Sequence, residues 1–375
     1  MRKIFTLLVA SLLYFTFAAT AQEEEKKEDA LSIGGAVRYN IHDKSWNDDA
    51  TDPQFTWDTW RLNVDATVSE VDLSFEYRFY PVDNAHFLHH GWLGYGFGDD
   101  LYVKLGATQV PFGITKYASH SWWFQIPYYV GLEDDYDMGI KFDYTGIENL
   151  TINVAYFHQP EPQGAPNYSG RYSYDITPSA TASLKETNQF NVRAALDVTE
   201  DIELGVSGQV GNNYNSVLDE SESSIALAGH AVANFGNFNF KGEYVYYNYG
   251  AQDNDGNDLD KVQMGAYGYD YNVAAEASMY VAGLAYSIDV DWGPISNVQP
   301  YVDYSRIEKA ADGYAATDHL VPGMLITAGS IYTYVDYAMG RNNAWLGNQW
   351  TDGLAEGIED DEWNSRFNIN IGYYF

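Results

Sequence analysis

The sequence has no cysteine among its 375 residues, so no disulfide bond can stabilise the fold. Basic residues are also scarce: 20 lysines and arginines stand against 53 aspartates and glutamates, which gives a formal net charge of −33 at pH 7. Nucleic-acid binding needs clustered basic side chains against phosphate, so this balance argues against a nucleic-acid partner. Docking on an anionic membrane surface is disfavoured for the same reason.

Long apolar runs are missing too, because no stretch reaches the ~18–20 residues that a membrane-spanning helix needs. The apolar region Ile4–Ala18 is too short to cross a bilayer. It follows the basic pair Arg2 and Lys3 and ends at the small-x-small motif Ala19-Thr20-Ala21. We interpret residues 1–21 as a secretory signal peptide rather than a membrane anchor, with a short periplasmic tail at residues 22–32 after cleavage.

What the sequence does have is tyrosine, with 33 residues, and a strict alternation of apolar and polar positions. The alternation is clearest at the end of the chain, where a period of two predicts a strand with one dry and one wet face. A last strand ending on an aromatic residue is typical of bacterial outer-membrane barrels, and we expect Phe375 to engage the barrel-assembly machinery. Tyrosine and tryptophan collect at both membrane interfaces of such barrels. The apolar positions of this strand are Phe367, Ile369, Ile371, Tyr373 and Phe375.

Alternating segments of about the length that a tilted strand needs to cross a membrane recur to the end of the chain. They predict an all-β fold: a transmembrane antiparallel β-barrel of about 16 strands over residues 33–375, in the outer membrane and in contact with its lipid. The predicted strands are Ile33–Ile41, Trp57–Val68, Asp72–Tyr80, Phe87–Phe97, Leu101–Phe112, Asp137–Tyr144, Leu150–His158, Asn188–Val198, Ile202–Val210, Ser224–Phe235, Phe238–Tyr249, Ala277–Ile288, Val298–Arg306, His319–Ala328, Ile331–Gly340 and Trp363–Phe375.

The connections support the barrel independently. Every second gap is short, as expected of periplasmic turns, except Asp289–Asn297. The other gaps are long, as expected of outer loops, except Pro81–His86; the fifth of them is Gly211–Ser223. A soluble β-sandwich has no reason to alternate in this way.

Charged residues within the strands fall almost entirely on the parity that faces the lumen. A basic side chain on the lipid face near mid-bilayer would cost ~2–4 kcal/mol, so the lumen is predicted to be wet. A barrel this wide leaves an aqueous channel, which predicts a porin for small hydrophilic solutes and ions. The lumen charges are Arg38, Arg61, Arg78, Lys104, Lys141, Arg193, Lys241 and Arg366, with Asp65, Glu76, Asp143, Asp197, Glu203, Glu243, Asp303 and Asp336.

The third outer loop, Gly113–Tyr136, is the candidate for a constriction, because a loop so rich in aromatic residues is unlike one that sits in water. We expect it to fold into the barrel and to present its acidic run, Glu133, Asp134 and Asp135, to the lumen. Opposite it, barrel closure brings together the strands that carry Arg38, Arg61, Arg78 and Arg366. Lys104 is a further candidate pore-lining residue. Two alternatives stay open: a transverse field across the channel, or simple wall pairing of the arginines with Asp65 and Glu76.

The strand Leu101–Gly113 reads hydrophobic-x-Gly-x-x-x-x-Pro-Phe-Gly, and with Tyr136–Lys141 it resembles the phosphate-selective porin O and P family. That resemblance implies a homotrimeric outer-membrane porin, which in the named members passes anions through a ladder of arginines and lysines. Here the lumen charges are balanced and the loops acidic, so a general or weakly cation-preferring pore fits the composition better.

Other site chemistry finds little support. Among His86, His89 and His90, strand alternation puts only His86 and His90 on one face, so no metal site is expected. Residues 253–260 fail the spacing of a calcium loop. No catalytic motif is found, so neither a catalytic residue nor a cofactor is expected. The competing interpretation is a non-conducting outer-membrane barrel that acts in adhesion or structure, or as a barrel enzyme.

Overall fold

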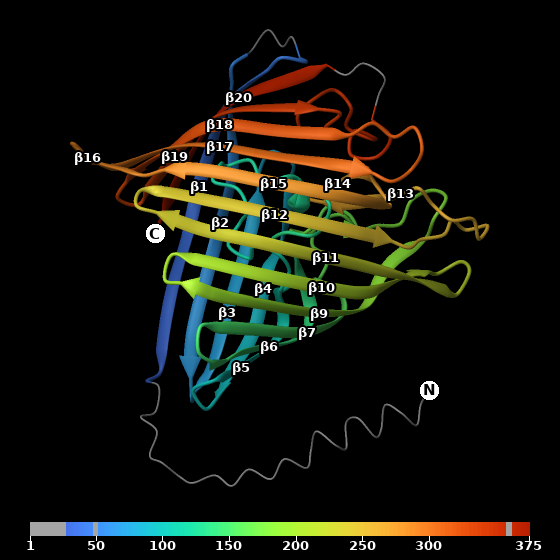
Figure 1. The fold of residues 1–375 in the computed structure, drawn as a ribbon, viewed down its shortest axis with the longest axis horizontal. Coiled ribbons are helices and arrows are strands. Elements are labelled where there is room, and N and C mark those ends of the chain that lie inside the picture. The colour runs from blue at the N-terminus through green and yellow to red at the C-terminus, as the bar shows by residue number, and fades with distance from the viewer. Residues whose placement is uncertain (1–27, 48–51, 358–361) are drawn as a thin grey trace.

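The computed structural model describes residues 28–47, 52–357 and 362–375. The predicted signal peptide, residues 1–21, lies outside the described residues. Sixteen long antiparallel strands close into a barrel (Figure 1), because β1 pairs with both β2 and β20. They are β1 Ala30–Lys44, β2 Gln54–Val68, β3 Val71–Tyr80, β4 Ala85–Phe97, β5 Leu101–Gln109, β6 Tyr136–Ile147, β7 Leu150–Pro160, β9 Leu184–Thr199, β10 Ile202–Asn215, β11 Glu220–Phe235, β12 Phe238–Tyr249, β15 Glu276–Tyr286, β17 Ile295–Lys309, β18 Thr317–Ala328, β19 Ile331–Arg341 and β20 Trp363–Tyr374.

The predicted barrel is therefore confirmed, and its strand ends differ by a few residues. The first strand begins at Ala30, inside the segment that the sequence assigns to the periplasmic tail. A short strand, β16 (Ile288–Trp292), continues β15 and forms a hairpin with β17, which accounts for the one long turn in the predicted series. Among the described residues, no helix is long and apolar enough to cross a bilayer.

Long and short connections lie at opposite ends of the barrel (Figure 1). The turns at 69–70, 98–100, 148–149, 200–201, 236–237 and 329–330 are tight. The fifth outer loop is shorter than predicted, because β10 and β11 stay paired as far as Asn215 and Glu220. The side-chain oxygen of Asn215 then accepts hydrogen bonds from the next backbone N–H groups and tightens the turn.

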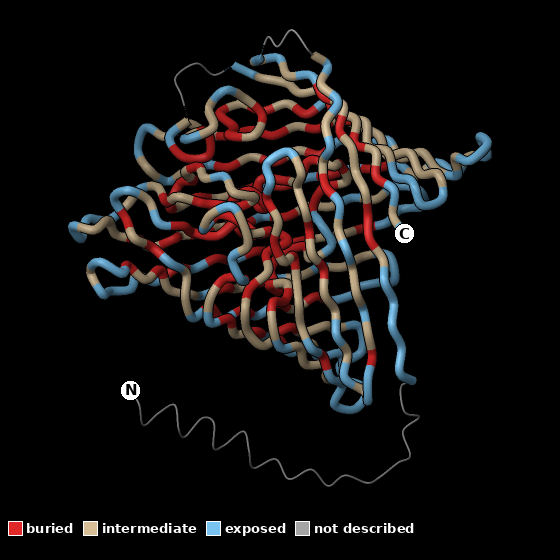
Figure 2. The backbone as a smooth tube through the Cα atoms, turned by 180° about the vertical axis from the view of Figure 1, so that it is seen from behind, coloured by how far each residue is buried: buried red, intermediate tan, exposed pale blue. Residues whose placement is uncertain are grey.

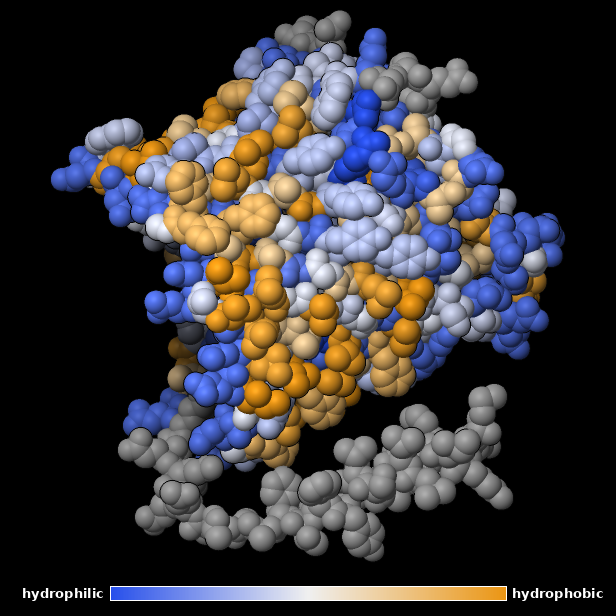
Figure 3. Space-filling model, viewed as in Figure 1, coloured by the Kyte–Doolittle hydropathy of each residue, from blue (hydrophilic) through white to orange (hydrophobic). Residues whose placement is uncertain are grey.

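The outside of the barrel is apolar along its strands. Leu62, Leu73, Phe142 and Tyr144, on the parity opposite to that of the lumen charges, are more than a third exposed. Figure 3 shows apolar side chains gathered over the strands and hydrophilic ones toward the loop ends. This separation is the one that a hydrocarbon layer around the barrel requires.

The inside is filled largely by the outer loops, and the buried segments gather there (Figure 2). The third loop (110–135) includes a short helix, α2 (Ile126–Tyr129). The fourth loop (161–183) and the sixth (250–275) share a small sheet of β8 (Asp175–Ile176), β13 (Lys261–Ala266) and β14 (Tyr269–Ala274). With residues 342–357 of the eighth loop they form one apolar core. Its largest fully buried side chains are Tyr172, Tyr247, Tyr271, Phe87, Phe157, Ile126, Leu184, Met264, Met279, Ile307, Leu346 and Leu354.

The loops contain strands that alternation did not predict, for a physical reason. Backbone N–H and C=O groups drawn into the barrel lose water and must find other partners. Short strands such as β13 and β14, paired over residues 261–274, meet that requirement.

Candidate functional site

Beside the loop core, a cavity of about 610 Å³ runs along one side of the lumen. Strands β1, β2, β3, β19 and β20 form its wall, and the third loop closes it from the inside. Arg38, Asn40, His42 and Lys44 line it from β1. Since a strand rises about 3.3 Å per residue, these alternate positions span about 20 Å along the strand, which is itself tilted by about 35–45° from the barrel axis. The cavity is therefore elongated in the direction in which a solute would cross.

Four arginines predicted to meet here all line this cavity: Arg38, Arg61, Arg78 and Arg366. Barrel closure brings them together, as β20 pairs with β1 and β1 with β2. Arg61 on β2 lies directly opposite Arg78 on β3, and Arg366 lies opposite Lys44. We call Arg38, Arg61, Arg78 and Arg366 the arginine stripe.

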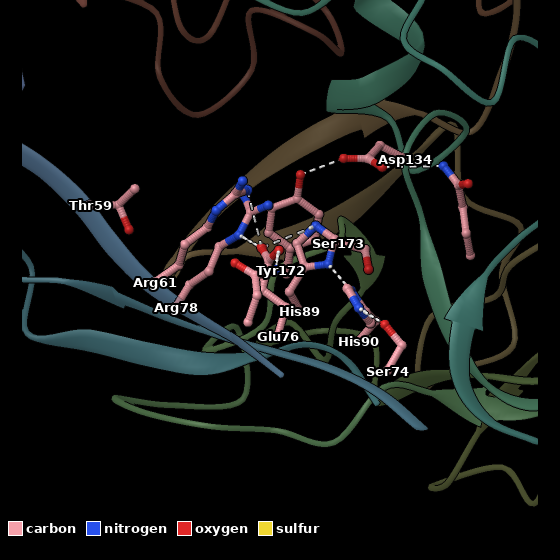
Figure 4. Close-up of polar contacts among 12 residues, drawn as sticks. Thr59, Arg61, Ser74, Glu76, Arg78, His89, His90, Asp134, Tyr172 and Ser173 are labelled. Carbon is pink, nitrogen blue, oxygen red and sulfur yellow. Dashed lines mark hydrogen bonds and ion pairs between the residues drawn. The ribbon is translucent and has the colours of Figure 1, made fainter. Parts of the chain in front are cut away.

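Two carboxylates neutralise part of this charge. Glu76 Oε1 lies 2.5 Å from Arg78 Nε and 3.5 Å from Arg61 Nη1 (Figure 4). Asp58 Oδ2 lies 2.8 Å from Arg38 Nε. The predicted pairing with Glu76 thus exists, whereas Asp65 accepts a hydrogen bond from Ser74 instead, at 2.7 Å.

Aromatic rings support the remaining faces of the stripe. Arg78 stacks on Tyr172 at 4.3 Å, Arg61 on Tyr374 at 5.2 Å and Arg366 on Trp123 at 4.9 Å from the ring centroid. Stacking holds each guanidinium in place and leaves its edge free to donate hydrogen bonds. Within the described residues, Nε of Arg61 and Nε of Arg366 are buried and have no hydrogen-bond partner.

Two β-bulges shape this wall, and strand alternation cannot reveal them. An irregularity between β1 and β2 turns Asp58 inward, on the same side as Arg61. Another between β3 and β4 places both His89 and His90 on the lumen side, where their Nδ1 atoms lie 2.8 Å apart. The expectation that His86 and His90 share a face is therefore wrong, because the extra residue resets the parity. His86 instead contacts Tyr77, an outward-facing residue, at 2.6 Å.

The third loop folds into the barrel as predicted and docks on the opposite wall. The backbone N–H groups of His120 and Ser121 donate to Asp303 on β17, at 2.6 and 2.8 Å. Gly113 accepts a 2.8 Å hydrogen bond from Arg193 on β9. Lys241 on β12 donates to two further loop carbonyls. The loop thus crosses the lumen and narrows it toward the arginine stripe.

The acidic run lies elsewhere than predicted. Glu133, Asp134 and Asp135 are each at most 7% exposed and do not line the cavity. Asp134 accepts a 2.5 Å hydrogen bond from Tyr172, which in turn stacks on Arg78 (Figure 4). Burial raises the pKa of Asp134 to about 6, against hydrogen bonds that favour the carboxylate. The run supports the loop from behind, because folding the loop inward turns its acids toward the barrel wall.

Lys104 also lies off the cavity. Its ammonium group is 3.2 Å from Asp143 and stacks against Trp92. The charged residues that do line the cavity are mainly basic. They are Arg38, Lys44, Arg61, Arg78 and Arg366, against Asp58 and Asp83.

Sequence reasoning missed most of the tyrosines of this site. Tyr172, Tyr267 and Tyr269 come from the fourth and sixth loops, far along the chain from the stripe. The large number of tyrosines was the one available signal, and it pointed to the membrane interface instead.

Two groups of side chains have ligand atoms spaced closely enough for a metal ion. One is Glu76, His89 and His90, and the other is Asp135, Asp137 and Asp175.

No protein-family model matches the sequence, and no curated protein shows significant similarity to it. Solved structures do match over nearly the whole chain. The anion-selective porin from Comamonas acidovorans covers 93% of this chain and 100% of its own, with a TM-score of 0.61 and 13% identity. OmpF of Salmonella typhi, in complex with daunomycin, covers 93% of this chain and 100% of its own, with a TM-score of 0.63 and 11% identity. The trimer form of OmpT from Vibrio cholerae covers 93% of this chain and 100% of its own, with a TM-score of 0.56 and 13% identity.

This barrel has the porin fold. At such low identity the likeness establishes the fold alone. Together with the apolar outer face of the strands, the porin fold indicates a bacterial outer-membrane protein.

Proposed function

We propose that this porin-fold barrel is a passive channel for small hydrophilic solutes and ions, with a preference for anions. The observation that carries the proposal is the arginine stripe, which follows the cavity and outnumbers its acids. Arg61 and Arg366 both line the cavity and are partly exposed, so their guanidinium charge acts on a passing anion. The composition alone favoured a general or cation-preferring pore, but the acids of the third loop are turned away from the cavity.

Further observations support finer assignments. The resemblance of residues 101–113 to the phosphate-selective porin O and P family supports an anionic solute. The similar trimer form of OmpT supports a homotrimer here. We further propose that residues 1–21 direct export, that a short periplasmic tail follows, and that Phe375 is read by the barrel-assembly machinery.

The test is the reversal potential of the refolded protein in a planar bilayer under a salt gradient. We expect an anion-preferring potential for the wild type. Arg366→Gln should shift it toward cations, because Arg366 contributes a cavity charge that pairs with an amide, Asn368, rather than with an acid. Lys104→Gln is the matched control: it removes the same charge from the lumen but outside the cavity. Equal shifts in the two variants would refute the role of the stripe.

One feature favours a second candidate function. The third, fourth, sixth and eighth loops pack into a continuous apolar core inside the barrel. Such a core is also what a non-conducting barrel would need, whether it acts in adhesion or as an enzyme at its rim. Correctly folded protein that gives no conductance would support this alternative and overturn the channel.

A further inference from the structure

Five carboxylates meet behind the third loop, on the far side from the cavity. Asp135 ends that loop, Asp137 is the second residue of β6, and Glu161 follows β7. Asp175 lies on β8, where its backbone pairs with β13, and Glu186 lies at the start of β9. Asp135, Asp137, Glu161 and Asp175 are 7%, 3%, 1% and 1% exposed. Four chain segments thus converge on one buried acidic group.

Three of these carboxylates are held through one oxygen. Gln189 Nε2 donates to Asp137 Oδ2 at 3.2 Å. The backbone N–H groups of Tyr172 and Ser173 donate to Glu161 Oε1, at 3.1 and 3.0 Å. Arg171 Nη1 lies 3.2 Å from Asp175 Oδ2.

In the described part of the chain, the second oxygen of these three carboxylates, and one oxygen of Asp135, meet no N–H donor, and Asp175 lies beside the carboxyl groups of Glu161 and Glu186. Within the described residues, Oδ1 of Asp135, Asp137 and Asp175 and Oε2 of Glu161 are buried without a hydrogen-bond partner. A buried polar atom without a partner costs about 1–3 kcal/mol, more when it is charged. Metal-binding carboxylates are typically oriented by a hydrogen bond to one oxygen while the other oxygen binds the metal. These carboxylates have the same arrangement.

The charge of the group is also unbalanced. In the part of the chain that the structure describes, Arg171 is the basic side chain that pairs with it. Carboxylates this close to one another, with one arginine among them, repel each other. A bound cation would relieve both the repulsion and the lack of partners.

We propose that Asp135, Asp137 and Asp175 bind a divalent cation of the Ca²⁺ type, with Glu161 as a further ligand. One oxygen from each of the three aspartates lies within 4.8 Å of the others. Oxygens this close together can share one cation, and Ca²⁺ accepts six to eight oxygen ligands at about 2.3–2.6 Å in a flexible geometry. An all-oxygen ligand set likewise selects a hard cation over a transition metal.

The second cluster with suitable spacing is a poorer candidate. Glu76, His89 and His90 also place ligand atoms within 4.8 Å of one another. However, Glu76 is already paired with Arg78 and Arg61, whose charges would repel a cation. The acidic group has one arginine for five carboxylates, so the cation belongs there.

A cation at this position would fasten the third loop to the barrel wall. It would join the end of that loop to β6 through Asp135 and Asp137, and both to the fourth loop through Asp175. The constriction would then be held by metal ligation as well as by its hydrogen bonds to β9 and β17.

The test uses the full-length folded protein in detergent, stripped with EGTA and then titrated with Ca²⁺. Equilibrium dialysis measures the bound metal, and Tb³⁺ luminescence excited through nearby tyrosines reports on the site. The test variant is Asp135→Asn/Asp175→Asn. The matched control is Asp255→Asn/Asp258→Asn, which removes the same charge from the exposed sixth loop.

We expect one Ca²⁺ per chain in the wild type and the control and none in the test variant. Whether the wild type or the test variant has the higher melting temperature should depend on whether Ca²⁺ is present. In EGTA the test variant should melt at a higher temperature than the wild type, since repulsion is relieved; with Ca²⁺ the wild type should melt higher.

Wild-type protein that binds no Ca²⁺ at millimolar concentration would overturn the proposal, as would equal loss of Ca²⁺ in the two double variants. If the test variant fails to fold, Glu161→Gln replaces it, with an expected loss of affinity of about tenfold. Unchanged affinity in Glu161→Gln, with the wild type binding, would remove Glu161 from the ligand set and count against the site as assigned. These measurements do not depend on conduction, so they stand apart from the channel function.

Discussion

At the scale of single residues, Glu76 holds the arginine stripe together. It is 4% exposed and lies between Arg61 and Arg78, which face each other across β2 and β3. Like charges directly opposite on a sheet are destabilising, so Glu76→Gln leaves the buried Arg78 and the half-buried Arg61 uncompensated. We expect a loss of about 3 kcal/mol in unfolding free energy and a stronger anion preference. Urea unfolding and the reversal potential measure the two effects.

Asp65→Asn is the control for this change, because Asp65 also lies on the lumen side of β2 but is exposed and contacts a serine. Its unfolding free energy should stay within about 0.5 kcal/mol of the wild type. If Glu76→Gln were as stable as Asp65→Asn, the ion pairs around Glu76 would contribute nothing to the wall.

Residue by residue, the sequence predicts the stripe but not its partners. Arg38, Arg61, Arg78 and Arg366 could be placed because regular alternation and barrel closure fix where they point. Asp58 and His89 could not, because each lies at a bulge that adds one residue and reverses the parity. Bulges depend on pairing across strands, which the local pattern of one strand does not contain.

At the scale of elements, the seating of the third loop depends on Gly131. Its φ of +78° is in the left-handed region, and a Cβ there would lie 2.3 Å from the carbonyl oxygen of Tyr174 in the fourth loop. Gly131→Ala should therefore push the two loops apart while the barrel stays closed. We expect a larger and noisier single-channel conductance, with normal heat-modifiable migration on gels as evidence of a folded barrel.

Gly236→Ala is the control that separates the effect of backbone strain from the effect of displacing the third loop. Gly236 also has a positive φ, +60°, but nothing lies within 4 Å of a Cβ built there. Both variants should lose about 1–2 kcal/mol from the left-handed backbone, yet Gly236→Ala should conduct as the wild type does. Identical conductance in the two variants would show that Gly131 does not position the loop.

The strands were predictable as elements and the inner faces of the loops were not. A strand between lipid and a wet lumen must alternate apolar and polar side chains, so its sequence shows the pattern at every position. The third, fourth, sixth and eighth loops pack on one another inside the lumen, where no solvent imposes a period. Their aromatic residues indicated burial for the third loop, but Tyr172 and Tyr271 gave no sign of the partners they would meet.

At the scale of the whole molecule, charges of opposite sign are arranged in sequence along the path of a solute. The net charge is −33, and exposed acids such as Asp219, Glu220, Asp255 and Asp258 lie on the outer loops. The stripe lies deeper, shielded by the barrel wall and the third loop. An anion therefore meets repulsion before attraction, and salt screens exposed charges far more than buried ones.

This order of charges predicts an unusual dependence on salt. The Debye length falls from about 30 Å at 0.01 M to about 10 Å at 0.1 M, which removes the reach of the outer acids while leaving the stripe effective. Anion preference, read from reversal potentials at a fixed concentration ratio, should therefore increase over this range. Asp255→Asn/Asp258→Asn should already show a higher preference at 0.01 M, and so a smaller increase. A preference that falls steadily with salt, equally in both proteins, would mean that the outer loops do not influence entry and that the stripe alone sets selectivity.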